Sequence, residues 1–70
     1  MDEFILKLKE QFEEENISIY HNSKFRDLDG WDSMTALMVI AMLDELYNYQ
    51  IDPEEFKKYE YVYELYDLIK

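Results

Sequence analysis

The residues of this sequence best suited to chemistry lie in one short stretch, Asp29-Gly30-Trp31-Asp32-Ser33-Met34. Gly30 adopts backbone angles that other residues resist, so the chain can turn sharply there. Asp32 and Ser33 have side-chain oxygens that accept hydrogen bonds from the free N–H groups at a helix start, and apolar residues come next at helical spacing. A serine here holds its hydroxyl at the positive end of a helix dipole, where phosphate binds readily. An ordinary helix cap, the commoner explanation, has the same features, so both interpretations stay open.

Two other kinds of site can be tested on the same region. His21, Ser33 and a carboxylate could form a hydrolase triad, but the chain has no Gly-x-Ser-x-Gly sequence, only one histidine and little volume for a substrate cleft. The loop acids suggest an EF-hand, but their register puts Phe25 and Ala36 at ligand positions that require acids. We therefore expect no catalytic residue and no metal site, and we expect His21 to be a loop residue.

The charge of the chain indicates its class of partner. Asp and Glu number 17 against 7 Lys and Arg, which gives a formal net charge of -10. Such a surface repels nucleic acid and anionic membranes, and it attracts basic patches on other proteins. The absence of cysteine excludes disulfides and thiol nucleophiles. No secretory signal is visible, and the longest apolar run, Ala36 to Leu43, is too short to cross a bilayer, so we expect a cytoplasmic protein.

The length and the apolar pattern predict one all-α domain over residues 1–70. Apolar spacing predicts helices over 2–15, 34–49 and from about 60 onward, with a short helix over 54–58 after Pro53. The alternation of tyrosines at 59, 61 and 63 would also suit a strand, but helical spacing persists to the end. Residues 16–30 form a long loop pinned to the core by scattered apolar residues, with a short strand over 17–20 as an option. The predicted fold is a small four-helix bundle of three longer helices and one short helix.

The predicted helix over 34–49 is apolar nearly all round. One stripe is expected to face the core, and it consists of Ala36, Val39, Ile40, Leu43 and Tyr47. A second stripe consists of Met34, Leu37, Met38, Ala41 and Met42. Because so small a bundle cannot bury a whole helix, we assign the second stripe to a partner-binding face beside Ser33, with Met42 partly in the core. Trp31 is expected to pack the preceding loop onto the bundle.

The segment from Phe25 to Met34, FRDLDGWDSM, and the two segments after it resemble the acyl carrier protein family. An apolar helix ends in Asp44-Glu45-Leu46-Tyr47, and Ile51-Asp52-Pro53-Glu54-Glu55-Phe56 comes next. Asp-Ser-Met at 32–34 is similar to the family's Asp-Ser-Leu signature, in a common variant. The resemblance covers nearly the whole chain and implies the fold of a carrier protein, which is not an enzyme.

The resemblance also implies a cofactor and its partners. In that family the signature serine carries a 4'-phosphopantetheine arm, transferred from coenzyme A by a separate phosphopantetheinyl transferase. Ser33 matches this serine, and Asp32 matches the adjacent acid. Family members present the next helix to partner enzymes with basic patches, and Asp44 and Glu45 match acids near its end.

One departure from the family pattern bears on the pathway. Thr35 and Met38 stand where fatty-acid carriers often have acids, so the expected partner face is more apolar than usual. This favours a carrier of a specialised pathway over a housekeeping fatty-acid carrier.

The expected function is a discrete, monomeric acyl carrier protein. It would present an acyl group to acyl-loading ligases or transferases and to synthases of a fatty-acid, polyketide or other specialised pathway. The nearest alternative is an aminoacyl or peptidyl carrier protein. An alternative of another class is an acidic helical interaction protein, which would bind basic partners through charge and would not need Ser33.

Overall fold

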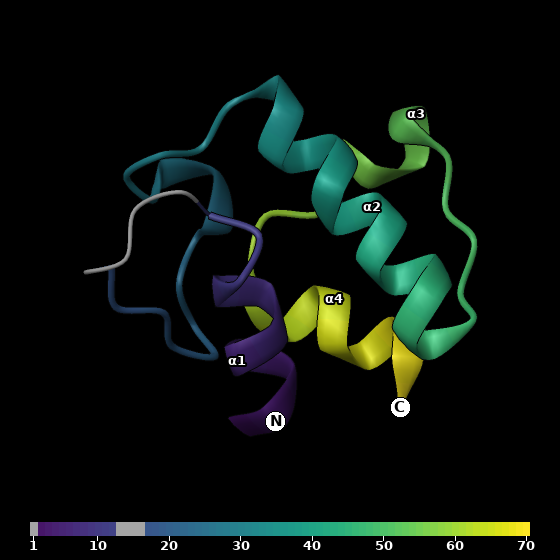
Figure 1. Cartoon of the computed structure of the whole chain (residues 1–70), viewed down its shortest axis with the longest axis horizontal. Coiled ribbons are helices and arrows are strands. Elements are labelled where there is room, and N and C mark those ends of the chain that lie inside the picture. The colour runs from purple at the N-terminus through teal and green to yellow at the C-terminus, as the bar shows by residue number, and fades with distance from the viewer. Residues whose placement is uncertain (1, 13–16) are drawn as a thin grey trace.

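The computed structural model describes residues 2–12 and 17–70, which form four α-helices and one 3-10 turn (Figure 1). The α-helices are α1 (Asp2–Lys9), α2 (Ser33–Tyr47), α3 (Pro53–Phe56) and α4 (Val62–Ile69), and the 3-10 turn η1 covers Phe25–Asp27. The all-α prediction is confirmed for the described ranges, which contain no strand longer than an isolated bridge between Lys24 and Tyr61. None of the helices found there is both long enough and apolar enough to span a membrane.

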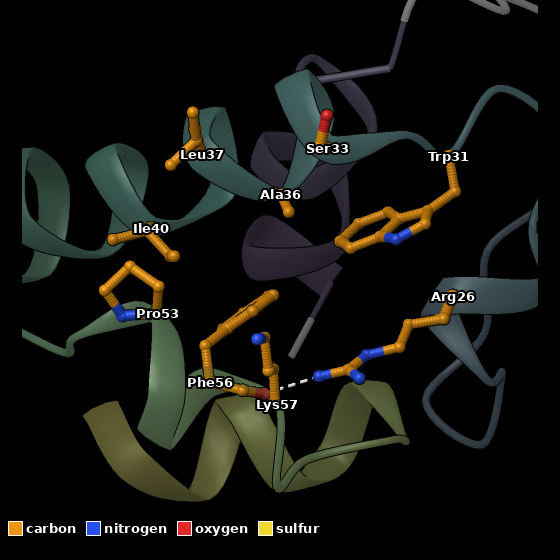
Figure 2. Close-up of a pocket in the computed structure, with 9 residues that line it drawn as sticks. All are labelled: Arg26, Trp31, Ser33, Ala36, Leu37, Ile40, Pro53, Phe56 and Lys57. Carbon is orange, nitrogen blue, oxygen red and sulfur yellow. Dashed lines mark hydrogen bonds between the residues drawn. The ribbon is translucent and has the colours of Figure 1, made fainter.

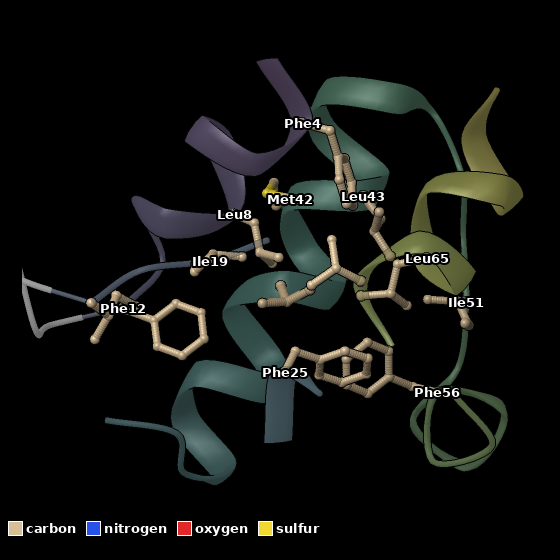
Figure 3. Close-up of a cluster of buried hydrophobic side chains, with 13 residues drawn as sticks. Phe4, Leu8, Phe12, Ile19, Phe25, Met42, Leu43, Ile51, Phe56 and Leu65 are labelled. Atoms are coloured by element: carbon tan, nitrogen blue, oxygen red, sulfur yellow. The ribbon is translucent and has the colours of Figure 1, made fainter. Parts of the chain in front are cut away.

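The core is a single hydrophobic cluster to which all four helices contribute (Figure 3). Its most deeply buried large side chains are Phe4, Leu8, Val39, Leu43, Val62, Leu65 and Phe25. In α1 and just after it the buried positions recur every fourth residue, at Phe4, Leu8 and Phe12, whereas Ile5 is only half-buried. The buried face of α1 therefore runs through Phe4 and Leu8, and Phe4 packs edge-on against Tyr66 of α4 at 5.7 Å between ring centroids.

The buried line of α2 also differs in part from the predicted one. Val39 and Leu43 are buried as expected, whereas the other three members of the predicted core stripe are half-buried and pack against the edge of the cluster, namely Ala36, Ile40 and Tyr47. Thr35 and Met42 are buried in their place. The buried face of α2 is therefore rotated toward Thr35 and Met42, and Ala36 and Ile40 line an open groove on the side facing α3.

The segment that precedes α2 is pinned to the core as predicted. Ile17, Ile19 and Phe25 are buried, and Leu28 packs against the cluster. The strand considered over 17–20 is wrong, because no other segment in the described ranges forms a bridge with those residues. The segment is instead joined to the start of α4 by backbone hydrogen bonds, in which Phe25 donates to Glu60 and residues 62 and 63 donate to the carbonyls of residues 23 and 21.

The helix ends show which local interactions fix the bounds. α2 ends at Tyr47 rather than at residue 49, because Asn48 is left-handed with φ 56° and its N–H bonds back into the helix. α4 begins at Val62 rather than near residue 60, because the Glu64 carboxylate accepts two backbone N–H groups just ahead of it. α1 ends at Lys9, and residues 13–15 of the predicted helix lie outside the described residues.

Candidate functional site

The start of α2 is fixed by a cap that leaves Ser33 free. Asp32 is the N-cap residue, and its Oδ1 atom accepts hydrogen bonds from the Thr35 backbone N–H at 2.8 Å and from the Thr35 hydroxyl at 2.9 Å. Ser33 is the first residue of the helix and its side chain is exposed. The capping prediction therefore holds for Asp32, and the Ser33 hydroxyl is not used for that purpose.

Thr35 holds the preceding loop and the helix together. Its hydroxyl oxygen lies 3.2 Å from the carbonyl oxygen of Gly30, which takes the positive φ of 88° that favours glycine. Thr35 is only 3% exposed, so its hydroxyl is almost completely shielded from solvent. The resemblance to carrier proteins placed Thr35 on the partner face in place of an acid, and this is wrong, because the side chain is buried in the fold and donates to the N-cap residue Asp32.

The electrostatics of the cap keep Asp32 charged. The backbone and side-chain hydrogen bonds from Thr35 lower the pKa of Asp32 below its ordinary value, because they stabilise the carboxylate. The negative charge lies at the positive end of the α2 dipole, where it is favourable. The first turn of α2 carries no other acid. The Ser33 hydroxyl is thus next to a single anionic group at a helix start.

A groove opens beside Ser33 between α2 and α3 (Figure 2). It has a volume of about 300 Å³, and apart from Ser33 its lining residues are Arg26, Trp31, Ala36, Leu37, Ile40, Pro53, Phe56 and Lys57. Figure 2 shows the Ser33 hydroxyl at the rim, pointing away from Phe56. The groove was not predicted, because its lining comes from segments before α2, within α2 and within α3.

Aromatic rings form one wall of this groove. Trp31 stacks on Phe56 with ring centroids 6.2 Å apart and planes inclined by 18°. Trp31 also contacts Phe25 and Phe12, with ring centroids 5.3 Å and 5.8 Å from its own. The prediction that Trp31 packs the loop onto the bundle is confirmed, and the same contacts fix the position of the groove wall.

The proposed partner face is exposed at most of its assigned positions. Met34 and Leu37 are 63% and 56% exposed, and Met38 and Ala41 are also exposed. Asp44 and Glu45 are exposed near the end of the same helix. Met42 is buried in the core, as the sequence partly anticipated. The first turns of α2 thus present apolar side chains to solvent beside Ser33, which is the arrangement a protein partner can use.

In the described part of the chain, the fold does not bring together the residues of the two alternative sites, the hydrolase triad and the metal site. His21 is exposed and lines a different hollow with Leu6 and Ile19, so it is not among the residues that line the groove beside Ser33. Its backbone carbonyl accepts a hydrogen bond from the Tyr63 N–H. In the part of the chain that the structure describes, no three His, Asp or Glu side chains are grouped so that they could hold a metal ion.

Comparisons with protein-family models, with curated proteins and with solved structures find no match to this chain. The function must therefore be inferred from the sequence pattern and from the geometry around Ser33.

Proposed function

We propose that this protein is an acyl carrier, in which Ser33 bears a 4'-phosphopantetheine arm and holds an acyl group for partner enzymes. The observation that carries this proposal is the exposed hydroxyl of Ser33, the first residue of the longest described helix. Because Asp32 caps this helix, the Ser33 hydroxyl is not needed as a cap, and it lies next to an apolar groove. The similarity of the segment from Phe25 to Met34 to the acyl carrier signature supports the same interpretation, as does the order of four helices.

The residues around Ser33 fit a phosphate ester. The hydroxyl is at the surface, and no hydrogen bond from the described residues engages it. The helix dipole and the free N–H groups of the first turn favour a phosphate there. In the transfer, the Ser33 hydroxyl loses its proton to a base of the transferase and its oxygen forms a bond to the arm's phosphorus, while the pyrophosphate bond of coenzyme A breaks and adenosine 3',5'-bisphosphate leaves. When bound, phosphopantetheine supplies a thiol, which this chain lacks.

The surface of α2 supports the choice of partners. Beside Ser33 the helix exposes Met34, Leu37, Met38 and Ala41, and near its end it exposes Asp44 and Glu45. Apolar contacts flanked by acids suit a transferase, ligase or synthase whose docking surface combines an apolar centre with a basic patch. The net charge of -10 would speed encounters with such enzymes, in a manner that salt weakens.

The test is intact mass after incubation with coenzyme A, magnesium and a broad-specificity phosphopantetheinyl transferase. We expect the protein to gain one phosphopantetheine, and we expect Ser33→Ala to gain none. Ser18→Ala is the matched control, because Ser18 is another exposed serine and its replacement should leave the gain intact. Circular dichroism of each variant shows that the fold is retained.

A folded protein that gains no mass with several transferases would overturn the proposal. The net charge would then favour the alternative of another class, an acidic helical protein that binds basic partners. In that event, replacing Ser33 would leave partner binding unchanged, because the charge is spread over the whole surface.

A further inference from the structure

Arg26 differs from most of the other basic residues of the chain. Four lysines form ion pairs with acids at 3.2 to 3.7 Å, namely Lys7, Lys24, Lys57 and Lys70. Arg26 has no acid within salt-bridge distance among the residues that the structure describes, although acids outnumber bases 17 to 7. A guanidinium is the side chain best matched to a carboxylate, so its isolation in so acidic a protein calls for an explanation.

The guanidinium of Arg26 is fixed in place while most of its donors remain unused. Its Cζ atom lies 5.5 Å from the ring centroid of Phe25 and 5.6 Å from that of Phe56. Nη2 donates to the Phe56 carbonyl at 2.6 Å, and no other described residue accepts from the group. The Nε atom is buried and has no hydrogen-bond partner in the described ranges. The donors that a ligand in the groove can reach are therefore those of the Nη atoms that the Phe56 carbonyl leaves free, and a guanidinium already held in place loses little freedom when a ligand accepts from them.

Arg26 lies in the wall of the groove that opens beside Ser33. In Figure 2 its side chain extends beneath Trp31 toward Phe56, and the dashed line marks its bond to the Phe56 carbonyl. The other lining side chains are apolar except for Ser33 and Lys57. At about 300 Å³, the groove is at the lower end of the range for small-molecule sites, which suits a short chain with one polar end.

We infer that this groove binds the acyl group carried on Ser33, and that it selects a short acyl group ending in a carboxylate, with Arg26 as the specificity-determining residue. The inference rests on the proposed function. A methyl-ended chain would fill the groove but leave the Arg26 donors unpaired, whereas a carboxylate would accept charge-assisted hydrogen bonds from them. The acidic surface elsewhere repels an anionic group, which leaves the groove as its favoured position.

The experiment compares two acyl groups of the same shape. The transferase loads Ser33 from stable amide analogues of succinyl-coenzyme A and of 4-methylpentanoyl-coenzyme A, in which a branched alkyl end replaces the carboxylate. Mass spectrometry confirms each product. We expect the Arg26 Nε–H resonance to shift, and the Nη–H protons to exchange more slowly with water, in the succinyl form only. We also expect the succinyl form to melt about 4 °C higher than the 4-methylpentanoyl form.

Two variants separate the guanidinium from charge in general. Arg26→Lys keeps the positive charge but loses the planar fork of donors, and we expect it to abolish most of the difference in melting temperature. Lys70→Met removes a positive charge outside the groove, and we expect it to preserve the difference, because Lys70 is paired with Asp67 and does not line the groove. If Arg26→Lys does not fold, the Nε–H measurement on the natural protein decides alone.

Failure of the inference and failure of the proposed function give different results. If neither analogue is transferred to Ser33, the carrier function is contradicted. If both are transferred but the Arg26 resonance and the melting temperature do not distinguish them, the carrier function stands and the selection of a carboxylate is overturned.

Discussion

Two helices of this protein begin in the same way and yet have different surroundings. At the start of α2, Asp32 accepts the backbone N–H of Thr35 at 2.8 Å, and at the start of α3, Asp52 accepts that of Glu55 at 2.9 Å. Both are helix caps of one chemical type. A cap alone therefore does not mark a functional site in this molecule.

The two starts differ in the residues that come directly after the cap. Asp52 is followed by Pro53 and by two acids in the first turn, and α3 has only four residues. Asp32 is followed by Ser33, which is the first residue of a helix of 15 residues that has no acid in its first turn. Proline has no hydroxyl, and the neighbouring carboxylates would repel a phosphate. Both starts border the groove, since Ser33 and Pro53 line it, but of the two only the start of α2 combines a hydroxyl with a first turn that has no acid.

The strongest test of this comparison moves the serine from one cap to the other. We expect the double variant Ser33→Ala with Pro53→Ser to gain no phosphopantetheine, although it has a serine directly after a capping aspartate. The single variant Pro53→Ser should gain one arm, at Ser33 alone. Peptide mapping by mass spectrometry locates the modification. An arm attached at position 53 would show that the cap itself is the recognised feature.

The next test concerns the third helical residue at each start. We expect Thr35→Val to lower the free energy of unfolding by about 1–2 kcal/mol, because the buried hydroxyl that bonds to Asp32 and Gly30 is lost. Glu55→Ala in α3 should change stability by less than about 0.5 kcal/mol, because only its backbone N–H takes part in the cap. Urea denaturation followed by circular dichroism measures both. Equal losses would contradict the distinction drawn between the caps.

A smaller effect is expected from charges on the two helices. Replacing Asp44 and Glu45 of α2 by their amides should slow transfer of the arm a few-fold at low salt, because the proposed function assigns to these acids the electrostatic steering of the transferase. The matched pair Glu54→Gln and Glu55→Gln on α3 removes the same charge and should leave the rate almost unchanged. Steady-state kinetics at low and high salt tests this. The effect should vanish at high salt, and equal slowing by both pairs would show that only net charge matters.

The smallest effect is expected from pH. Hydrogen bonds from Thr35 lower the pKa of Asp32 in the folded protein below the ordinary value of 3.8. Its contribution to stability is therefore present above that value and is lost as the pH falls through the lowered folded pKa. Asp32→Asn, which retains a capping side chain, should lose less stability than the natural protein between neutral pH and about pH 3. Urea midpoints of both proteins at the two pH values measure this, and an equal loss of stability in the two proteins would contradict it.

Local features of the fold were predictable from the sequence, because they depend on neighbouring residues. The capping role of Asp32, the long apolar helix after it and the break at Pro53 are all determined by residues within one helical turn. The groove was not predictable, because Arg26, Trp31 and Phe56 come from separate segments and only their packing brings them together. In the sequence Arg26 is one base among seven, and only the fold shows the rings around it and its unpaired nitrogen.

The errors have similar causes. Thr35 was compared with acids of a partner face, but periodicity alone cannot show on which side of a helix a neighbour packs. The strand considered over 17–20 satisfied an alternation of apolar residues, yet a strand needs a partner, and none is present among the described residues. Both errors concern contacts between elements rather than the elements themselves.

The contacts that hold the loop before Ser33 have a consequence for the newly made chain. Phe25 donates its N–H to Glu60, and Arg26 reaches the carbonyl of Phe56, thirty residues further along the sequence. During synthesis on the ribosome, Ser33 emerges well before either acceptor, at a time when its loop has no anchor. Under the proposed function, the transferase would therefore meet a complete site only after α3 and the start of α4 have emerged, and the order of translation would itself delay modification of unfinished chains.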